Sequence, residues 1–410
     1  MIVNRRSLIL SGASLAVPGG ALAAEPPREI IAEQDFDELW RTLDERYCYF
    51  GQKATDWNKA RRLYRPQAIA AQDEAAFTDV LSRMLFELYD PHTHVATSAD
   101  GTQRYGPFDL WADWRGGKAV VFDVRQDSQA SHAGVRPADE IISVDGAPIA
   151  AAVAAARPRC LTRPDPEAEA WSLRQAIAGR RAKDRKLEVV RGGKPRLLTL
   201  TAVSTPPEPP LFWKRLDGGL GYIRISTFSE ESAVAEFDKA LEALRTAPGL
   251  IIDARRNGGG DTAVARPMMG RFIKTRMRYA YMRRRAGTGL SAPWQEYVDP
   301  RGPFTYEAPV VVLTDRWSAS MAEGFPMGMH GLGRARVVGT PMMQLGAAVF
   351  SCRLDRSGVD AQYSGEPVYD AQDHPRWLMR PDVEVTPSPS GEDVILPAGI
   401  AELKRMIAAA

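Results

Sequence analysis

The chain of 410 residues has few cysteines, little net charge and no long apolar run after its first 23 residues. Cys48, Cys160 and Cys352 are far apart and form no C-x-x-C pair, which argues against a cysteine metal site. One disulfide remains possible, but the sequence does not choose the pair. The formal net charge of +2 gives no support for nucleic acid as a partner. No later window is apolar enough to predict a membrane-spanning helix.

The N-terminus differs from the rest and predicts export. The stretch "MIVNRRSLILSGASLAVPGGALAAEPP" has two arginines at 5–6, an apolar run over 8–22, and small residues at Ala21 and Ala23. These are the three parts of a secretory signal, and the Arg-Arg-x-Leu pattern favours the twin-arginine route. We therefore expect removal of residues 1–23 and a periplasmic or secreted protein. A membrane anchor is the alternative, but the run is short and broken by Gly and Pro.

Hydrophobic spacing divides the remaining chain. Residues 24–98 carry apolar side chains at helical intervals, and "DWNKARRLYRPQA" predicts a helix that ends before Pro66. Residues 104–203 alternate short β-branched runs with turns such as "VDGAP", which predicts a β-rich domain. The proline-rich residues 204–212 predict an extended linker. Strands such as "LGYIRIS" and "APVVVLTD" alternate with helices in residues 213–410, which predicts an α/β domain.

A glycine-rich loop follows the apolar strand at 250–252. Its sequence, "RRNGGGD", allows backbone N–H groups to approach a ligand closely. It lacks the Lys-Ser/Thr of a phosphate-binding Walker loop and the spacing of a dinucleotide fingerprint. An oxyanion hole fits, because it needs exposed backbone donors beside a nucleophile. A plain turn is the alternative.

The stretch "DRWSASMAEGF" at 315–325 follows the next buried strand. Ser318 or Ser320 could cap a helix, and Glu323 stands at capping-box distance from Ser320. A serine at a strand-to-helix turn is also suited to be a nucleophile, because the helix N-terminus stabilises developing negative charge. The stretch "DPHTHV" supplies His92 and His94, and histidine is the usual general base for a hydroxyl.

Several of these segments together resemble the tail-specific (C-terminal processing) and tricorn peptidase family. "GYIRISTF", "LIIDARRNGGG", "VVVLTDRWSASMAEGF" and "ARVVGTPM" resemble its protease core, and "RPDVEVTP" is similar to its closing P-D-V-x-V. "VVFDVRQDSQASHAGVRPADEIISVDG" resembles its PDZ module, and the helical region through "LYDPHTHV" resembles the tricorn-like branch. The resemblance covers most of residues 33–405. It implies an α/β (α+β) fold: a crotonase/ClpP-like α/β protease core, an N-terminal helical region and an inserted PDZ-like β-rich domain.

The resemblance also implies a serine endopeptidase that needs no metal or cofactor, and the N-terminal signal predicts that it is exported. Its base falls on His92, the histidine of the D-x-H-T pattern, and its nucleophile on Ser320, which leaves Ser318 a structural role. The implied oxyanion donors are the N–H groups of Met321 and one glycine, with Gly259 favoured. Gly258 and Glu323 are expected to support this site.

The sequence departs from the family at two positions. The lysine base of the bacterial processing proteases is replaced by Leu345, which nearly excludes a Ser–Lys dyad. The tricorn-like branch orients its histidine with a Glu in "E-G-x-G-x-x-P-D", where this chain has "DAQDHPRWLMRPD". We expect Asp373 or Asp370 to replace that carboxylate, and Gln344 to line the pocket.

The expected partner is a peptide or protein substrate, docked as an added strand on the PDZ-like domain. The alternative is a catalytically inactive member that binds peptide or apolar ligands, as the family's interphotoreceptor retinoid-binding protein does, because function depends on the site and not on the fold. A crotonase-type enzyme shares the core layout but leaves the PDZ-like segment and the S-x-S-x-x-E stretch unexplained.

Overall fold

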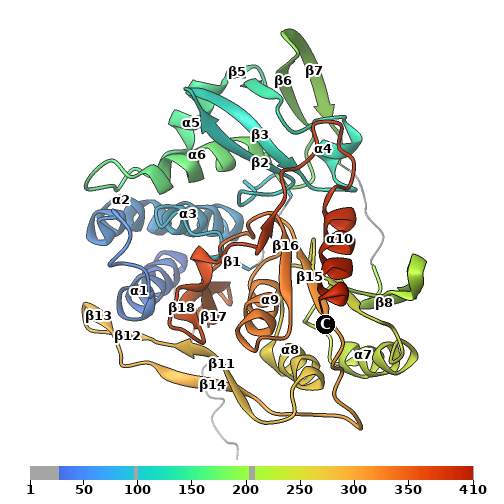
Figure 1. The fold of residues 1–410 in the computed structure, drawn as a ribbon. Helices are drawn as coiled ribbons and strands as arrows, with labels where there is room; N and C mark the ends of the chain where they lie inside the picture. The colour runs from blue at the N-terminus through green and yellow to red at the C-terminus, as the bar shows by residue number, and fades with distance from the viewer. Residues whose placement is uncertain (1–26, 97–99, 203–207, 410) are drawn as a thin grey trace, which may run out of the picture.

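The structure is a computed structural model that describes residues 27–96, 100–202 and 208–409. The predicted export signal lies outside the described residues. Within these ranges, none of the helices combines the length and the apolar character needed to span a bilayer. Figure 1 shows a helical region, a β-rich region and an α/β region packed against one another.

The helical region begins the described chain and matches the predicted periodicity. Asp56 and Asp73 cap the second and third helices by accepting backbone N–H groups. The second helix continues through Pro66, so the predicted end before this proline is wrong. Pro66 lies in the last turn, where its missing N–H removes one hydrogen bond while its carbonyl still accepts from the Ala70 N–H. The helices are α1 (Arg28–Arg46), α2 (Trp57–Ile69) and α3 (Glu74–Phe86).

The β-rich region is an antiparallel sheet with helices packed on it. The turn Asp145–Gly146 has positive φ at both residues and closes a hairpin, as "VDGAP" predicted. The sheet order is β2 (Leu110–Arg115), β3 (Lys118–Val124), β4 (Glu140–Val144), β6 (Arg185–Arg191) and β7 (Lys194–Leu200), with β5 (Ala147–Pro148) beside β4. The helices are α4 (Gln129–His132), α5 (Ile149–Ala156) and α6 (Pro166–Ala178).

The α/β region is built on a six-stranded sheet that is parallel except at β8. Its strands, in order, are β19 (Val383–Glu384), β16 (Arg336–Gly339), β15 (Val310–Thr314), β10 (Leu250–Asp253), β9 (Gly221–Ile225) and β8 (Leu211–Arg215). One face packs on α7 (Ser232–Ala243), α8 (Thr262–Met269) and α9 (Met321–Gly331), and the other on α10 (Ile395–Ala408). Because β8 begins at Leu211, the predicted linker at 204–212 overlaps a strand.

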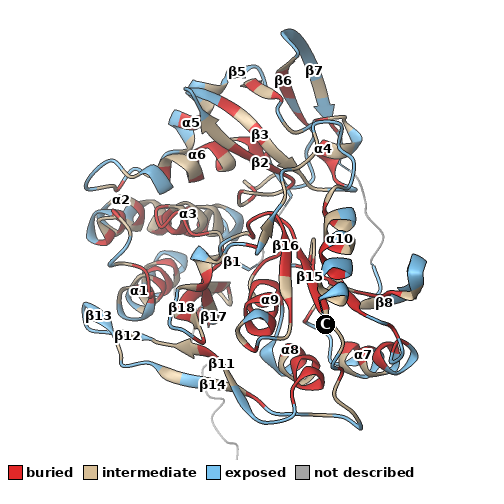
Figure 2. Ribbon diagram, viewed as in Figure 1, coloured by how far each residue is buried: buried red, intermediate tan, exposed pale blue. Residues whose placement is uncertain are grey.

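The central strands are the most buried part of this sheet. Every residue of β10 and β15 is buried (Figure 2), since both faces are covered by helices. This explains their continuous apolar sequences. Adjacent parallel strands also bring their carboxyl ends together, and here those ends carry the glycine loop and the serine stretch.

A second, antiparallel sheet joins the helical region to the α/β region. This sheet was not predicted from the sequence. Its strands are β1 (His94–Val95), β18 (Asp360–Asp370), β11 (Met277–Met282) and β14 (Trp294–Val298), with β17 (Ala347–Arg353) beside β18. Strand β1 pairs His94 with Gln362, so the turn before it lies against β18.

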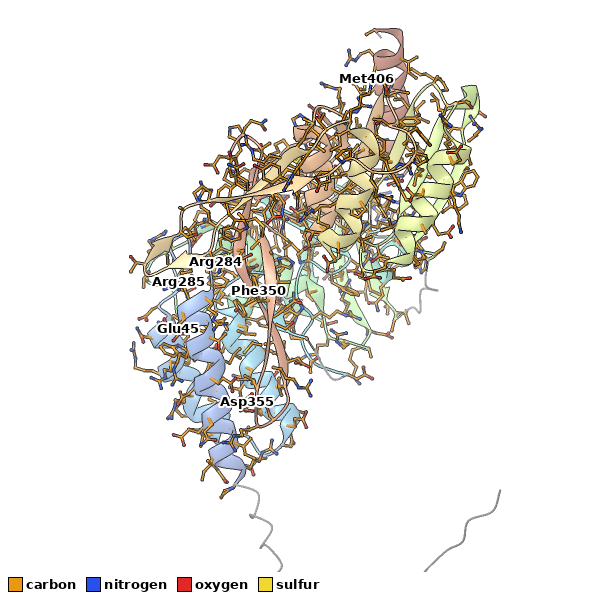
Figure 3. All side chains as sticks on the ribbon, turned by 90° about the horizontal axis from the view of Figure 1, so that it is seen from below. Glu45, Arg284, Arg285, Phe350, Asp355 and Met406 are labelled. Atoms are coloured by element: carbon orange, nitrogen blue, oxygen red, sulfur yellow. The ribbon has the colours of Figure 1, made fainter. Side chains whose placement is uncertain are left out.

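A small hairpin beyond this sheet reaches the helical region. It consists of β12 (Arg285–Ala286) and β13 (Gly289–Leu290). Arg285 donates to the carbonyl of Tyr47 at 3.4 Å, and Figure 3 shows this arginine near Glu45 at the end of α1. The remaining elements are short 3₁₀ turns at Asp217–Gly219, Gly270–Phe272 and Arg376–Leu378. The three cysteines are buried free thiols.

Candidate active site

The serine stretch forms a tight turn between β15 and α9. Ser320 is the N-cap of α9 and has φ 53° and ψ −115°, a backbone conformation that residues other than glycine rarely adopt. Such a residue costs about 1–3 kcal/mol and persists only where its surroundings hold it. Ser318 is fully buried and donates its hydroxyl to the Ala254 carbonyl at 2.9 Å, which ties this turn to the end of β10.

The glycine loop lies directly against the serine turn. The N–H of Ala319 donates to the carbonyl of Asn257 at 2.9 Å. A Cβ added at Gly259, whose φ is +102°, would lie 2.8 Å from Ser320 Cβ and 2.9 Å from the Met321 nitrogen. Such distances are too short for any side chain, so only glycine permits this approach.

The N–H groups of the two loops differ in availability. The Gly259 N–H donates to Asn257 Oδ1 at 2.8 Å, so it is occupied, contrary to our expectation that it serves as an oxyanion donor. The short Asn257 side chain folds back on its own loop and accepts the hydrogen bond from this N–H group. Among the described residues, the N–H groups of Gly258 and Met321 have no hydrogen-bond partner. These two donors remain available to an anion.

Glu323 holds the serine turn from within the protein. Glu323 is only 1% exposed, and its Oε1 accepts from the backbone N–H groups of Ser320 at 3.2 Å and Leu345 at 2.7 Å. Burial raises the pKa of Glu323 to about 7, against the opposing effects of Arg376 and these N–H groups. Its Oε2 has no partner among the described residues.

His92 lies in the turn between α3 and β1, and its residue is 6% exposed. Its backbone N–H donates to Asp90 Oδ1 at 3.0 Å, and its backbone carbonyl accepts from the Gln362 side chain at 2.9 Å. Burial lowers the pKa of His92 to about 4; Asp90 opposes this shift, whereas Arg376 and His94 add to it. Within the described chain, its Nδ1 has no partner and no hydrogen bond joins His92 to Ser320. His94 instead has Nδ1 3.1 Å from the Pro91 carbonyl.

The structure does not bring Asp373 or Asp370 to His92. Both carboxylate oxygens of Asp373 accept from Arg283, at 2.8 and 2.7 Å, and its side chain is 47% exposed. The Arg283 guanidinium also lowers the pKa of Asp373. Asp370 accepts two backbone N–H groups of its own turn and lies 3.1 Å from the His374 ring. The predicted orienting carboxylate is therefore not found at either position.

Three residues of the site were missed at the sequence level. Asp90 accepts from Thr93 and Ser364 through Oδ2 at 2.7 and 2.8 Å, which anchors the histidine turn to β18. Its place at the start of "DPHT" was a signal that could have found it. Asn257 and Arg376 gave no comparable signal, because their roles depend on contacts between distant segments.

A cavity of about 360 Å³ lies where the three regions meet. Asp90 and Pro91 line it beside the histidine turn, and Gln344 and Gly346 line it from the segment after the serine helix. Its other walls include the aromatic residues Tyr49, Tyr89, Trp111, Trp171 and Trp377. Nothing in the described ranges groups three or more His, Cys, Asp or Glu side chains as a metal site would.

Comparison with known proteins identifies the sequence relatives of this chain. Residues 219–385 match peptidase family S41, and residues 32–86 match the Tricorn protease C1 domain. Carboxy-terminal processing protease CtpB of Bacillus subtilis is 29% identical over 234 residues, which is 54% of this chain and 43% of that protein. Carboxyl-terminal-processing protease of Synechocystis sp. is 28% identical over 390 residues, 88% of this chain and 83% of that protein. The chain spans about half the length of the first curated relatives it matches.

A solved structure supports the fold. The crystal structure of mature CPAF has a TM-score of 0.62 at 17% identity, over 93% of this chain and 97% of that one. An identity this low shows the fold alone. Together with the family matches, it confirms the family resemblance and the α/β fold, whereas the PDZ-like domain stays a prediction.

Proposed function

We propose, from the peptidase family S41 domain at residues 219–385, that this chain is an exported serine endopeptidase of the C-terminal processing type. One observation carries the proposal: a serine at positive φ on a helix N-terminus packs against a glycine loop, beside N–H groups that have no partner among the described residues. A nucleophile and an oxyanion hole need this combination.

In the proposed reaction, Ser320 Oγ attacks the carbonyl carbon of a peptide bond while the His92 imidazole takes its proton. The carbonyl oxygen becomes an oxyanion, which the N–H groups of Met321 and Gly258 stabilise. The imidazolium then gives its proton to the leaving amine, and an acyl-enzyme remains on Ser320. Water, deprotonated by His92, releases the acid product.

The hydrogen bond between Ser320 and His92 belongs to the substrate-bound state in this proposal. Catalytic hydrogen bonds are often long in unliganded enzymes and tighten when substrate binds. The cavity beside the histidine turn is the proposed entry for an extended peptide or protein substrate. The PDZ-like region, proposed at residues 104–203, receives part of that substrate by strand addition, and residues 1–23 direct export.

The second candidate is an inactive binding protein. It is favoured by the absence of a carboxylate on the His92 ring within the described residues, and by the aromatic walls of the cavity. A fluorophosphonate probe, with mass spectrometry to locate the label, separates the two candidates.

The peptidase proposal predicts labelling at Ser320, loss of the label in Ser320→Ala, and loss of peptide hydrolysis in the same variant. The Ser390→Ala variant, which changes an exposed serine in the loop between β19 and α10, is the control and should match the unmodified protein. Undiminished hydrolysis by Ser320→Ala would eliminate this assignment. No label, combined with uptake of a fluorescent apolar probe, would favour the binder.

A further inference from the structure

Arg376 is a buried cation close to the serine half of the candidate site. Its residue is 5% exposed, and its Nη2 donates to the carbonyls of Leu345 at 2.5 Å and Ala347 at 3.1 Å. It forms no ion pair within the described ranges, and its Nε has no hydrogen-bond partner there. Buried charges are usually paired, because removing an ion from water is costly. The charge of Arg376 acts on the buried carboxyl group of Glu323, which holds the serine turn.

The backbone segment that Arg376 holds is connected to the proposed nucleophile. The Leu345 carbonyl accepts from Arg376, and the Leu345 N–H donates to Glu323 Oε1 at 2.7 Å. The same carboxylate oxygen accepts the Ser320 N–H at 3.2 Å. The hydrogen bonds thus run without a break from the guanidinium to the serine.

The guanidinium also lies against the serine helix itself. A Cβ added at Gly324, in the first turn of α9, would lie 3.5 Å from Arg376 Nη1. A fixed positive charge therefore stands beside the first turn of the helix. Burial raises the pKa of Glu323, and the charge of Arg376 opposes this rise, which favours the ionised carboxylate that accepts the Ser320 N–H.

The same charge acts on the imidazole. The groups whose charges act on His92 are Asp90 and His94, from its own turn, and Arg376, from the 3₁₀ turn Arg376–Leu378. Asp90 favours the imidazolium, whereas Arg376 and His94 disfavour it. A general base must be neutral before it takes a proton, so a neighbouring cation extends the pH range in which His92 is competent.

We propose that Arg376 is a positioning residue of the Ser320–His92 site. Its hydrogen bonds fix the segment behind Ser320, and its charge adds to the effect of burial, which keeps the imidazole neutral. The role in hydrolysis rests on the proposed function. The electrostatic effect on His92 does not, because it exists whether or not the protein cleaves peptides.

The first experiment therefore measures the charge effect without activity. Histidine labelled with ¹³C allows an NMR titration of each imidazole, and His92→Asn identifies the His92 signal. In Arg376→Gln we expect the His92 midpoint to rise by roughly one pH unit, as loss of a nearby cation does. The exposed Arg380→Gln is the matched control and should leave the midpoint unchanged. An unchanged midpoint in Arg376→Gln would overturn the electrostatic half of the proposal.

The second experiment separates charge from hydrogen bonding. Arg376→Lys keeps the charge but loses the planar fork, so it also serves if Arg376→Gln fails to fold. We expect Arg376→Lys to keep the His92 midpoint and to slow fluorophosphonate labelling of Ser320 at least roughly fivefold at neutral pH, through a less rigid serine turn. Labelling at the unmodified rate would overturn the positioning half. If the unmodified protein takes up no label, the proposed function fails, whereas the NMR titration still decides the role of the Arg376 charge.

Discussion

The two halves of the candidate site are built in different ways. The serine half lies at the carboxyl ends of the adjacent parallel strands β10 and β15, and backbone hydrogen bonds such as Ala319 to Asn257 join its loops. The histidine half is a short turn from another region, fixed through Asp90 and the pairing of β1 with β18. The parallel sheet thus holds Ser320 and the glycine loop together within one region. The position of His92 depends on how two regions pack together, and the proposed mechanism requires this packing to tighten when substrate binds.

Removing the base should have the largest effect on activity. In His92→Asn we expect hydrolysis to fall about 10²–10⁴-fold, the usual contribution of a general base. His94→Asn is the matched control, because this neighbouring ring lies near the Pro91 carbonyl and Tyr105. We expect its kcat/KM to stay within about threefold of the unmodified value, since it touches neither loop. Equal losses in both variants would mean that the turn matters only as structure.

Crowding the serine half should cost nearly as much. In Gly259→Ala the new methyl group would collide with Ser320 and Met321, so the oxyanion donors should shift and kcat fall by about 10²–10³-fold. Gly289→Ala, in the small hairpin, is the control, because a Cβ there meets nothing within 4 Å. Peptide hydrolysis and thermal unfolding of both variants test this. A fully active Gly259→Ala would show that the tight approach of the loops is dispensable.

The two halves should also respond to pH with opposite signs. The pKa of His92 is lowered from 6.5 to about 4, so the unfolded chain binds more protons in this window and stability is lost as pH falls through it. The pKa of Glu323 is raised from 4.5 to about 7, so the native state binds more protons and stability is lost as pH rises through that window. Each contribution is about 3 kcal/mol, and between about pH 4.5 and 6.5 the two oppose each other.

Urea unfolding of two variants separates these contributions. In His92→Asn only the Glu323 contribution remains, so the free energy of unfolding should decline with pH relative to the unmodified protein between about pH 4.5 and 6.5. Glu323→Gln keeps an oxygen to accept from Ser320 and Leu345 and should show the opposite trend. Identical slopes in all three proteins would contradict the burial of these groups.

The same contrast explains how much could be predicted from the sequence. The apolar strands at 250–253 and 310–314 are buried on both faces, so their continuous hydrophobic sequences predicted them correctly. The positions of the loops after them could then be predicted as well. The second sheet was missed because its strands are far apart in sequence and unevenly buried, as in β17. The extension of α2 past Pro66 depends on tertiary packing, which overrides local propensity.

The prediction of a carboxylate beside His92 was wrong for a physical reason. A side chain in a short turn is directed by its partners, and the partner of Asp373 is Arg283, which lies just after β11 in another segment. No local pattern gives that pairing. The buried position of Arg376 likewise follows from the carbonyls of Leu345 and Ala347, which come from a different element.

The smallest expected effect is that of Asp373→Asn, although the resemblance suggested a catalytic role for this residue. The variant weakens a largely exposed ion pair with Arg283, so the loss of stability should be at most about 1 kcal/mol. Hydrolysis should stay within about twofold, because the carboxylate does not contact His92. Asp90→Asn is the informative comparison: it disturbs a buried acceptor of the Thr93 and Ser364 hydroxyls, and should cost about 1–3 kcal/mol of unfolding free energy. A severe catalytic defect in Asp373→Asn with normal stability would mean that the turn at 370–374 swings toward His92 during turnover, and the histidine half would then be assembled only around substrate.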